Sequence, residues 1–324
     1  MVRFGYLLPT RGIVLTSEST STLTAKTRAD VLEMAPLAEA LGFESVWVGD
    51  SVLAKPRLEP LSTLAAVATR TEAVDLGTAV YLPALRDPVH VAHQTATLDQ
   101  LSGGRFSFGI GVGIGPDVAA EYGNLGVPYE ERGPRTDELL EVLTSLWAGE
   151  SVTHDGRFYE LEDASIGFGP AREPPIYVPS AAFDPDEGFP APIRDRMATH
   201  GDGWLPIGLS PETYASGLAS VREFVADAGR DPDAVDPALY LDVVIGEPDR
   251  AIQEAREFYD RYYPSWDTLT DEEVRSHGVF GPPSRVAAAI EDYEAAGAET
   301  VVVRFTATDQ RAQLRRFADL APVD

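Results

Sequence analysis

Short β-rich runs alternate with amphipathic stretches along almost the whole 324-residue chain, and this alternation limits the possible folds. Eight runs predict strands, at residues 2–8, 45–49, 74–82, 105–112, 175–178, 203–206, 239–245 and 300–304. Eight helices are predicted between or after them, at 28–41, 60–70, 88–101, 135–147, 211–228, 248–262, 282–296 and 310–320. Repeated strand–helix units predict a parallel sheet in an α/β fold.

Two parallel architectures fit this pattern, a closed barrel and an open doubly wound sheet. Eight units over about 300 residues favour the closed (β/α)8 TIM barrel. The first strand leads to an ordinary helix and not to a phosphate-binding glycine turn, which disfavours the open nucleotide-binding sheet. Because no linker divides the chain, we expect residues 1–324 to form a single domain.

Two segments interrupt the alternation and predict insertions. Residues 151–162 alternate around Asp155 and Gly156, a signal for a hairpin turn. Residues 262–279 are aromatic and polar, with prolines nearby. Because long insertions in barrels tend to cover the active site at the strand C-termini, we expect both segments at that face, and 262–279 as a candidate lid.

The charge excludes several kinds of partner. The chain has 52 acidic and 26 basic residues, a formal net charge of −26, and the acidic residues are dispersed. Such a surface repels phosphate backbones and anionic lipid, so we expect neither nucleic acid nor membrane as a partner. Only Lys26 and Lys55 are lysines, and the other basic residues are arginines. Dispersed acid favours a halophilic protein over a patch for one cationic partner.

Several chemistries have no supporting motif. The chain lacks cysteine, which excludes disulfides, thiolate catalysis and Cys-ligated zinc. His90 and His93 could share a helix face, but no HExxH accompanies them, so we expect no metal. GxSxG, the motif of many hydrolases, is also absent. With no apolar run long enough to span a membrane and no signal-peptide pattern at the N-terminus, we expect a cytoplasmic protein.

Two candidates for a site lie where predicted strands end. Asp50 follows the strand at 45–49, so its carboxylate could bind a ligand, act as an acid or base, or cap the next turn. The glycine-rich run at 109–115 leaves another strand. Glycine there could let a flat ring approach the backbone, or could simply make a flexible exit.

Two further segments could bind an anion. Arg132 and Arg135 open a predicted helix, where cations oppose the helix dipole. They could hold a phosphate or pair with the neighbouring glutamates. The small residues at 179–182 follow a strand, and their backbone N–H groups suit a phosphate.

Several motifs together resemble one family. Residues 98–106 (LDQLSGGRF) are very similar to a signature of the luciferase-like monooxygenase superfamily, whose members use flavin or deazaflavin. Residues 40–50 (ALGFESVWVGD) resemble its second strand. The remaining matches follow in the family's order, at 109–113, 131–133, 155–159, 174–176, 201–204, 281–283 and 286–289. The resemblance covers nearly the whole chain and implies a TIM barrel with the ring at the strand C-termini.

The chain looks most similar to the branch that uses the deazaflavin coenzyme F420, including methylenetetrahydromethanopterin reductase. This resemblance implies an oxidoreductase that moves a hydride to or from a small organic substrate, and a homodimer. Two alternatives stay open. One is an FMN-dependent monooxygenase that uses O2, and the other is a non-catalytic barrel that binds a flavin or deazaflavin.

The resemblance also implies roles for individual residues. The ring would be contacted by Asp50, backed by a non-proline cis peptide within Thr78, Ala79 and Val80, and faced by Gly111 and Gly113. The cofactor phosphate would be held by Ser180, Ala181 and Ala182, with Gly203, Trp204 and Arg135 as further cofactor-binding residues. Asp50 and Asp99 are the catalytic candidates.

The sequence departs from the family at two positions. Ser51 stands where several deazaflavin relatives have a histidine that takes part in proton transfer. Leu7 stands where the reductase has a glutamate. A mechanism that depends on either residue is therefore not carried over to this chain.

Overall fold

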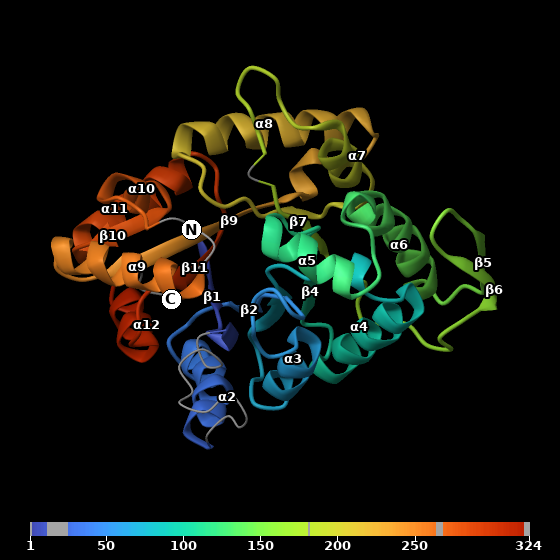
Figure 1. The fold of residues 1–324 in the computed structure, drawn as a ribbon, viewed down its shortest axis with the longest axis horizontal. Helices are drawn as coiled ribbons and strands as arrows, with labels where there is room; N and C mark the ends of the chain where they lie inside the picture. Colours follow the sequence, from blue (N-terminus) through green and yellow to red (C-terminus); the bar gives the residue numbers. More distant parts are fainter. Residues whose placement is uncertain (1, 12–24, 181, 264–267, 321–324) are drawn as a thin grey trace.

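The computed structural model describes residues 2–11, 25–180, 182–263 and 268–320, with the backbone alone for 25–30. Its centre is a closed barrel of parallel strands (Figure 1), which confirms the predicted (β/α)8 fold. The barrel strands in spatial order are β1 (Arg3–Leu7), β2 (Ser45–Val48), β3 (Asp75–Thr78), β4 (Phe106–Gly109), β7 (Ile176–Val178), β8 (Gly203–Trp204), β9 (Asp236–Ile245) and β11 (Thr300–Phe305). Pairing of β8 with β9 closes the barrel, and all eight strands were predicted from the sequence.

Helices surround the barrel (Figure 1). They are α2 (Ala25–Ala40), α3 (Pro60–Ala68), α4 (Pro88–Ser102), α5 (Pro116–Asn124), α6 (Arg132–Trp147), α7 (Ala191–His200), α8 (Pro211–Asp227), α9 (Pro248–Tyr262), α10 (Asp271–Ser276), α11 (Pro283–Ala295) and α12 (Gln310–Ala318). Several begin with proline, which is preorganised for the first turn. Side chains cap some of them, such as Glu59 at α3 and Asp87 at α4. Among the described helices, none has both the length and the apolar character needed to cross a membrane.

Three helices were missed by the sequence analysis, and each has a local reason. Helix α5 starts at Pro116, directly after the glycine-rich run, with Gly115 as its N-cap residue. Helix α7 contains proline and several charged residues and has few apolar positions to show a period. Helix α10 has only six residues, and a capping box between Thr270 and Glu273 starts it.

The two predicted insertions have different positions. The first contains the antiparallel hairpin of β5 (Val152–Asp155) and β6 (Glu160–Ala164), as predicted. The carboxylate of Glu138 in α6 accepts hydrogen bonds from the backbone N–H groups of Phe158 and Tyr159 and fixes the turn. The hairpin lies outside α6 (Figure 1) and contributes no residue to the cavity described below, so the expectation that it covers the site was wrong.

The second insertion includes the end of α9, helix α10 and part of an additional strand. This strand, β10 (Gly278–Gly281), pairs with the C-terminal half of β9, beyond the residues that pair with β8. Glycine at both of its ends weakens the strand signal in the sequence. Residues 264–267 of this insertion lie outside the described part of the chain.

Large rings on one strand fill the barrel above glycines on its neighbours. Trp47 of β2 lies over Gly5 of β1 and Gly77 of β3, because a Cβ atom on either glycine would come within 2.6 or 2.1 Å of side chains there. Tyr177 of β7 covers Gly203 of β8 in the same way. The rings of Trp47 and Tyr177 meet edge to face across the interior, 5.2 Å between centroids. Together the two rings fill the barrel interior just below its C-terminal end.

This packing predicts opposite effects for two glycine-to-alanine substitutions. Gly77→Ala should lower the free energy of unfolding by about 1–3 kcal/mol, because the new methyl group overlaps the buried Trp47 ring. Gly123→Ala in α5, where a Cβ meets nothing within 4 Å, should raise it by roughly 0.5–1 kcal/mol. Urea unfolding of both variants measures this difference, and equal effects would contradict the packing described here.

Candidate active site

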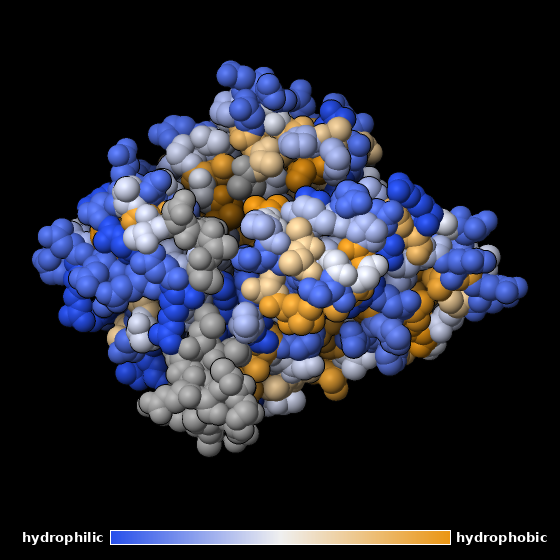
Figure 2. Space-filling model, viewed as in Figure 1, coloured by the Kyte–Doolittle hydropathy of each residue, from blue (hydrophilic) through white to orange (hydrophobic). Residues whose placement is uncertain are grey.

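A cavity of about 790 Å³ opens at the C-terminal end of the barrel. Its walls come from the segments that follow β1, β2, β3, β4, β7 and β8, and from β9 and β11. Helix α5, the end of α9 with the insertion after it, and the start of α12 complete them. Apolar surface gathers over α3 to α5, whereas the surface over α9 and α10 is mainly hydrophilic (Figure 2). A cavity of this size and position is typical of a small-molecule site in a barrel.

Asp50 lines the cavity directly after β2, as expected. Its carboxylate is already engaged, because Arg86 binds both oxygens and the backbone N–H of Leu82 donates to Oδ2 at 3.0 Å. Burial raises the pKa of Asp50, and the Arg86 guanidinium opposes this effect. The carboxylate therefore fixes the 82–86 segment in the wall and is not a free base facing the cavity.

The segment after β3 forms an apolar part of the wall. Ala79 and Val80 line the cavity, and the peptide bond between them is cis, at the position where the resemblance placed one. Thr78 points away, since its hydroxyl donates to the Gly109 carbonyl at 2.7 Å. Gly111 contacts Val80, because a Cβ there would lie 2.4 Å from the valine side chain.

Gly113 also lines the cavity, and its conformation requires glycine. Its φ is 67°, and a Cβ would come within 2.6 Å of the Val118 side chain. The guanidinium of Arg132 donates to the Gly113 carbonyl at 3.2 Å and so holds this loop from outside the cavity.

The predicted phosphate turn lies beside the cavity. Pro179 lines it, whereas Ser180 and Ala182 do not, and Ala181 is outside the described residues. Ser180 accepts a hydrogen bond from the N–H of Ala182 at 3.2 Å. Gly203 and Trp204 are not in the wall. Trp204 faces outward and stacks on Tyr214 of α8, 5.1 Å between centroids.

Two other predicted residues lie away from the cavity. Asp99 is fully buried and accepts from the N–H groups of Phe106 and Arg172, so it ties α4 to the beginning of β4, at the opposite end of the barrel. Arg135 pairs with Glu131 at 3.6 Å and covers the ring of Phe158. These contacts show that both side chains stabilise the fold and do not line the cavity.

One carboxylate that the sequence analysis did not single out holds the loop after β2. Glu121 of α5 accepts hydrogen bonds from the Ser51 hydroxyl and from the N–H groups of Val52, Leu53 and Ala54. Ser51 in turn accepts from the N–H of Lys55 at 2.8 Å. Ser51 therefore has a role in the geometry of this loop.

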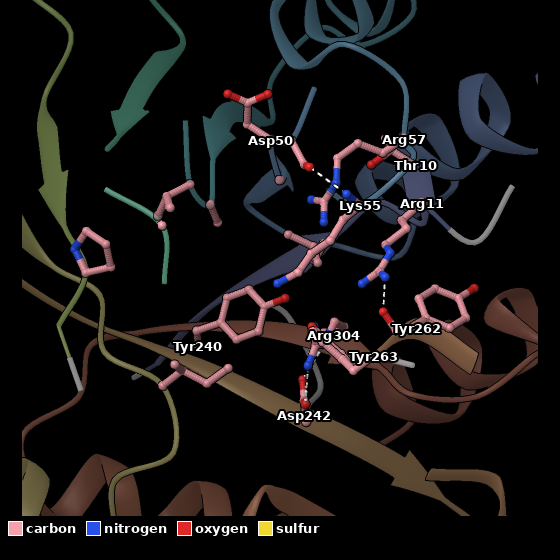
Figure 3. Close-up of a pocket in the computed structure, with 18 of the residues that line it drawn as sticks. Thr10, Arg11, Asp50, Lys55, Arg57, Tyr240, Asp242, Tyr262, Tyr263 and Arg304 are labelled. Atoms are coloured by element: carbon pink, nitrogen blue, oxygen red, sulfur yellow. Dashed lines mark hydrogen bonds and ion pairs between the residues drawn. The ribbon is translucent and has the colours of Figure 1, made fainter. Parts of the chain in front are cut away.

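The cavity also contains cations that the sequence analysis did not predict: Arg11, Lys55, Arg57 and Arg304 (Figure 3). Arg304 is paired, because its Nε lies 2.6 Å from Asp242. Although burial opposes the shift, Asp242 raises the pKa of Arg304. The sequence carried no signal for the other three, which come from the segments that follow β1 and β2.

Tyr263 is the aromatic centre of this cationic region. Arg304 Nη1 donates to its hydroxyl at 2.7 Å, and the Lys55 ammonium lies 5.0 Å from the ring centroid. Burial opposes the shift, but Arg304 and Lys55 together lower the pKa of Tyr263. A phenol with a lowered pKa exchanges a proton more readily near neutral pH than an ordinary tyrosine.

Among the described residues, no group of three or more His, Asp or Glu side chains is arranged to hold an ion.

The comparison with known families decides the classification. Residues 2–300 match the family model of the luciferase-like monooxygenases. This chain belongs to that family. It is 31% identical over 296 residues to an F420-dependent glucose-6-phosphate dehydrogenase of Intrasporangium calvum, covering 87% of this chain and 83% of the relative.

Solved structures share the fold of this family member. An F420-dependent secondary alcohol dehydrogenase, solved with an F420–acetone adduct, superposes with a TM-score of 0.81 at 21% identity, covering 99% of this chain and 98% of the other. A monooxygenase of Streptomyces bottropensis also gives 0.81, at 23% identity and 98% coverage of both chains. The same barrel thus serves dehydrogenases and monooxygenases, so the fold does not choose between them.

Proposed function

We propose that this chain is an oxidoreductase that uses coenzyme F420 to move a hydride to or from a small organic substrate. The observation that carries the proposal is the 31% identity over most of the chain to a relative named as an F420-dependent dehydrogenase. The cavity at the strand C-termini supports it, because its size and mixed lining suit a ring cofactor and a small molecule together.

The residues present fit such a cofactor. Ala79 and Val80 offer an apolar wall for one face of a flat ring, and Gly113 keeps the neighbouring loop free of a side chain. Asp50 holds Leu82 and Arg86 in position at the edge of this wall. When bound, the deazaflavin supplies the carbon that accepts or donates the hydride, while the protein orients it and excludes water.

Glucose 6-phosphate, named for the relative, is one candidate substrate. Because Ser51 is bonded to Glu121, it does not replace the histidine that takes part in proton transfer in several relatives. Tyr263 is the ionisable group of the cavity that we propose for proton exchange with the substrate, since Arg304 and Lys55 stabilise its ionised form.

Titration of the purified chain with F420, and separately with FMN, tests the proposal. F420 should bind, and the reduced cofactor should form when a substrate is oxidised. Binding of FMN in place of F420 would indicate the monooxygenase alternative, and binding of neither would indicate a non-catalytic barrel.

The same titration tests the assignment of Asp50. Asp50→Ala should weaken F420 binding by about tenfold or more, because it releases Leu82 and leaves Arg86 unpaired beside the ring site. Asp227→Ala, on the exposed end of α8, removes the same charge and should bind F420 as the parent does. An unchanged affinity in Asp50→Ala would rule out this role for Asp50.

We also propose that the chain is a halophilic protein, together with the homodimer and cytoplasmic location expected from its sequence. With 52 acidic and 26 basic residues, self-repulsion of the surface is relieved by screening. The free energy of unfolding should therefore rise between about 0.1 M and molar KCl, where the Debye length falls from roughly 10 to 3 Å. Stability that does not change with KCl would argue against halophilic adaptation.

A further inference from the structure

Three cations line the cavity and form no ion pair with a carboxylate of the described residues: Arg11, Lys55 and Arg57. The Asp50 carboxylate attracts Arg57 from a longer distance, but it is itself paired with Arg86. The other cations near the site are paired. Arg86 is bound to Asp50, and Arg304 is bound to Asp242. Glu121, the remaining acid of the wall, accepts hydrogen bonds from a hydroxyl and from backbone N–H groups through Oε1. Its Oε2 is buried without a hydrogen-bond partner among the described atoms.

The three side chains converge from the segments that follow β1 and β2 (Figure 3). The guanidinium of Arg11 and the ammonium of Lys55 each lie 5.0 Å from the centroid of the Tyr263 ring. The Arg57 guanidinium lies against Gly49, so closely that a Cβ there would come within 2.0 Å of Nη1. Its Nε atom is buried without a hydrogen-bond partner among the described atoms, and so is the Nε of Arg11.

Placing three like charges together in a partly buried site is unfavourable unless an anion joins them. Burial lowers the pKa of Lys55, and the charges of Arg11 and Arg57 lower it further. The composition makes the cluster more unusual, because acidic residues outnumber basic ones by two to one and Lys55 is one of only two lysines. The arrangement is therefore best explained by a ligand that carries negative charge.

We infer that Arg11, Lys55 and Arg57 form a binding subsite for an anionic group, a phosphate monoester or a carboxylate, on the substrate. This inference rests on the proposed function for the identity of its ligand as a substrate. The forked guanidinium groups can each bind two oxygens of such a group, and the ammonium adds a point charge. A neutral substrate would leave all three cations without an ion pair to a carboxylate or phosphate, with Tyr263 as the one neighbouring group that could offset their charge.

Barrel geometry favours the substrate over the cofactor phosphate as the source of the anion. In the closed strand order, β1 lies opposite β7 and β2 lies opposite β8. The small-residue turn expected to hold the cofactor phosphate follows β7, beyond Pro179. A cofactor held at its phosphate by that turn and at its ring by Ala79 and Val80 would leave the β1 side of the cavity for the substrate.

Rigid support makes this side a prepared site. Glu121 and Ser51 together hold residues 51–55 through the N–H groups of the loop. Arg11 is anchored by a hydrogen bond to the Tyr262 carbonyl. An anion can therefore bind to cations that are already in place, which reduces the entropic cost of binding.

Isothermal titration of the full chain with inorganic phosphate at constant ionic strength, with and without bound F420, measures the subsite. Phosphate should bind to the parent. Arg57→Gln and Lys55→Met should each weaken phosphate binding by about tenfold or more, since each removes a charged partner. Gly49→Ala should also weaken it, because it displaces the Arg57 guanidinium while all charges stay.

Arg70→Gln is the matched control, because Arg70 is exposed at the end of α3 and its loss changes the net charge equally. It should bind phosphate as the parent does. Equal phosphate affinity in the parent, Arg57→Gln and Lys55→Met would overturn the inference. Loss of F420 affinity in those variants, with phosphate affinity unchanged, would also overturn it and assign the cluster to the cofactor.

The two proposals fail separately in this design. If F420 does not bind the parent, the proposed function fails, whereas the phosphate titration still reports on the cluster. If F420 binds and phosphate does not, the anion subsite alone is rejected.

Discussion

The packing of Trp47 on Gly5 and Gly77 is the contact on which the rest of the structure depends. A ring of this size fits inside an eight-stranded barrel only where the neighbouring strands have no side chain. Tyr177 over Gly203 repeats the arrangement on the other side, and the two rings meet in the middle. The barrel is thereby filled at this level, and the cavity begins above it, where the strands end.

The charged side chains of the cavity, which lie above these two rings, fall into two groups. Asp50 with Arg86 and Asp242 with Arg304 are closed pairs, which can be buried because each charge has its partner. The second group consists of cations that line the cavity without an ion pair to a carboxylate of the described residues: Arg11, Lys55 and Arg57. A protein with a net charge of −26 repels anions at long range, so a local cationic subsite determines which anions are retained.

The sequence was sufficient for the architecture and for one wall of the site. Eight β-rich runs predicted the eight barrel strands, and the position of Asp50 at a strand end placed it in the cavity wall. The sequence was not sufficient to predict which side chains of a very short strand point into the barrel. Trp204, in a two-residue strand, faces α8 and not the barrel interior, and alternation cannot be read from two residues.

The cationic cluster could not be predicted for a different reason. Arg11 follows β1 and is far from Arg57 in the chain. Arg57 lies in an irregular loop, which has no period to show which way a side chain points. They meet because β1 and β2 are neighbours in the barrel and because Glu121, from a helix that was also missed, shapes the second loop. Contacts of this kind depend on tertiary structure and have no local signal.

A crystal structure of the chain with oxidised F420 and phosphate tests the account most directly. We expect the deazaflavin ring against Ala79 and Val80, with phosphate on its other side in contact with Arg11, Lys55 and Arg57. A ring bound elsewhere, or the acidic tail of the cofactor seated on these three cations, would contradict it.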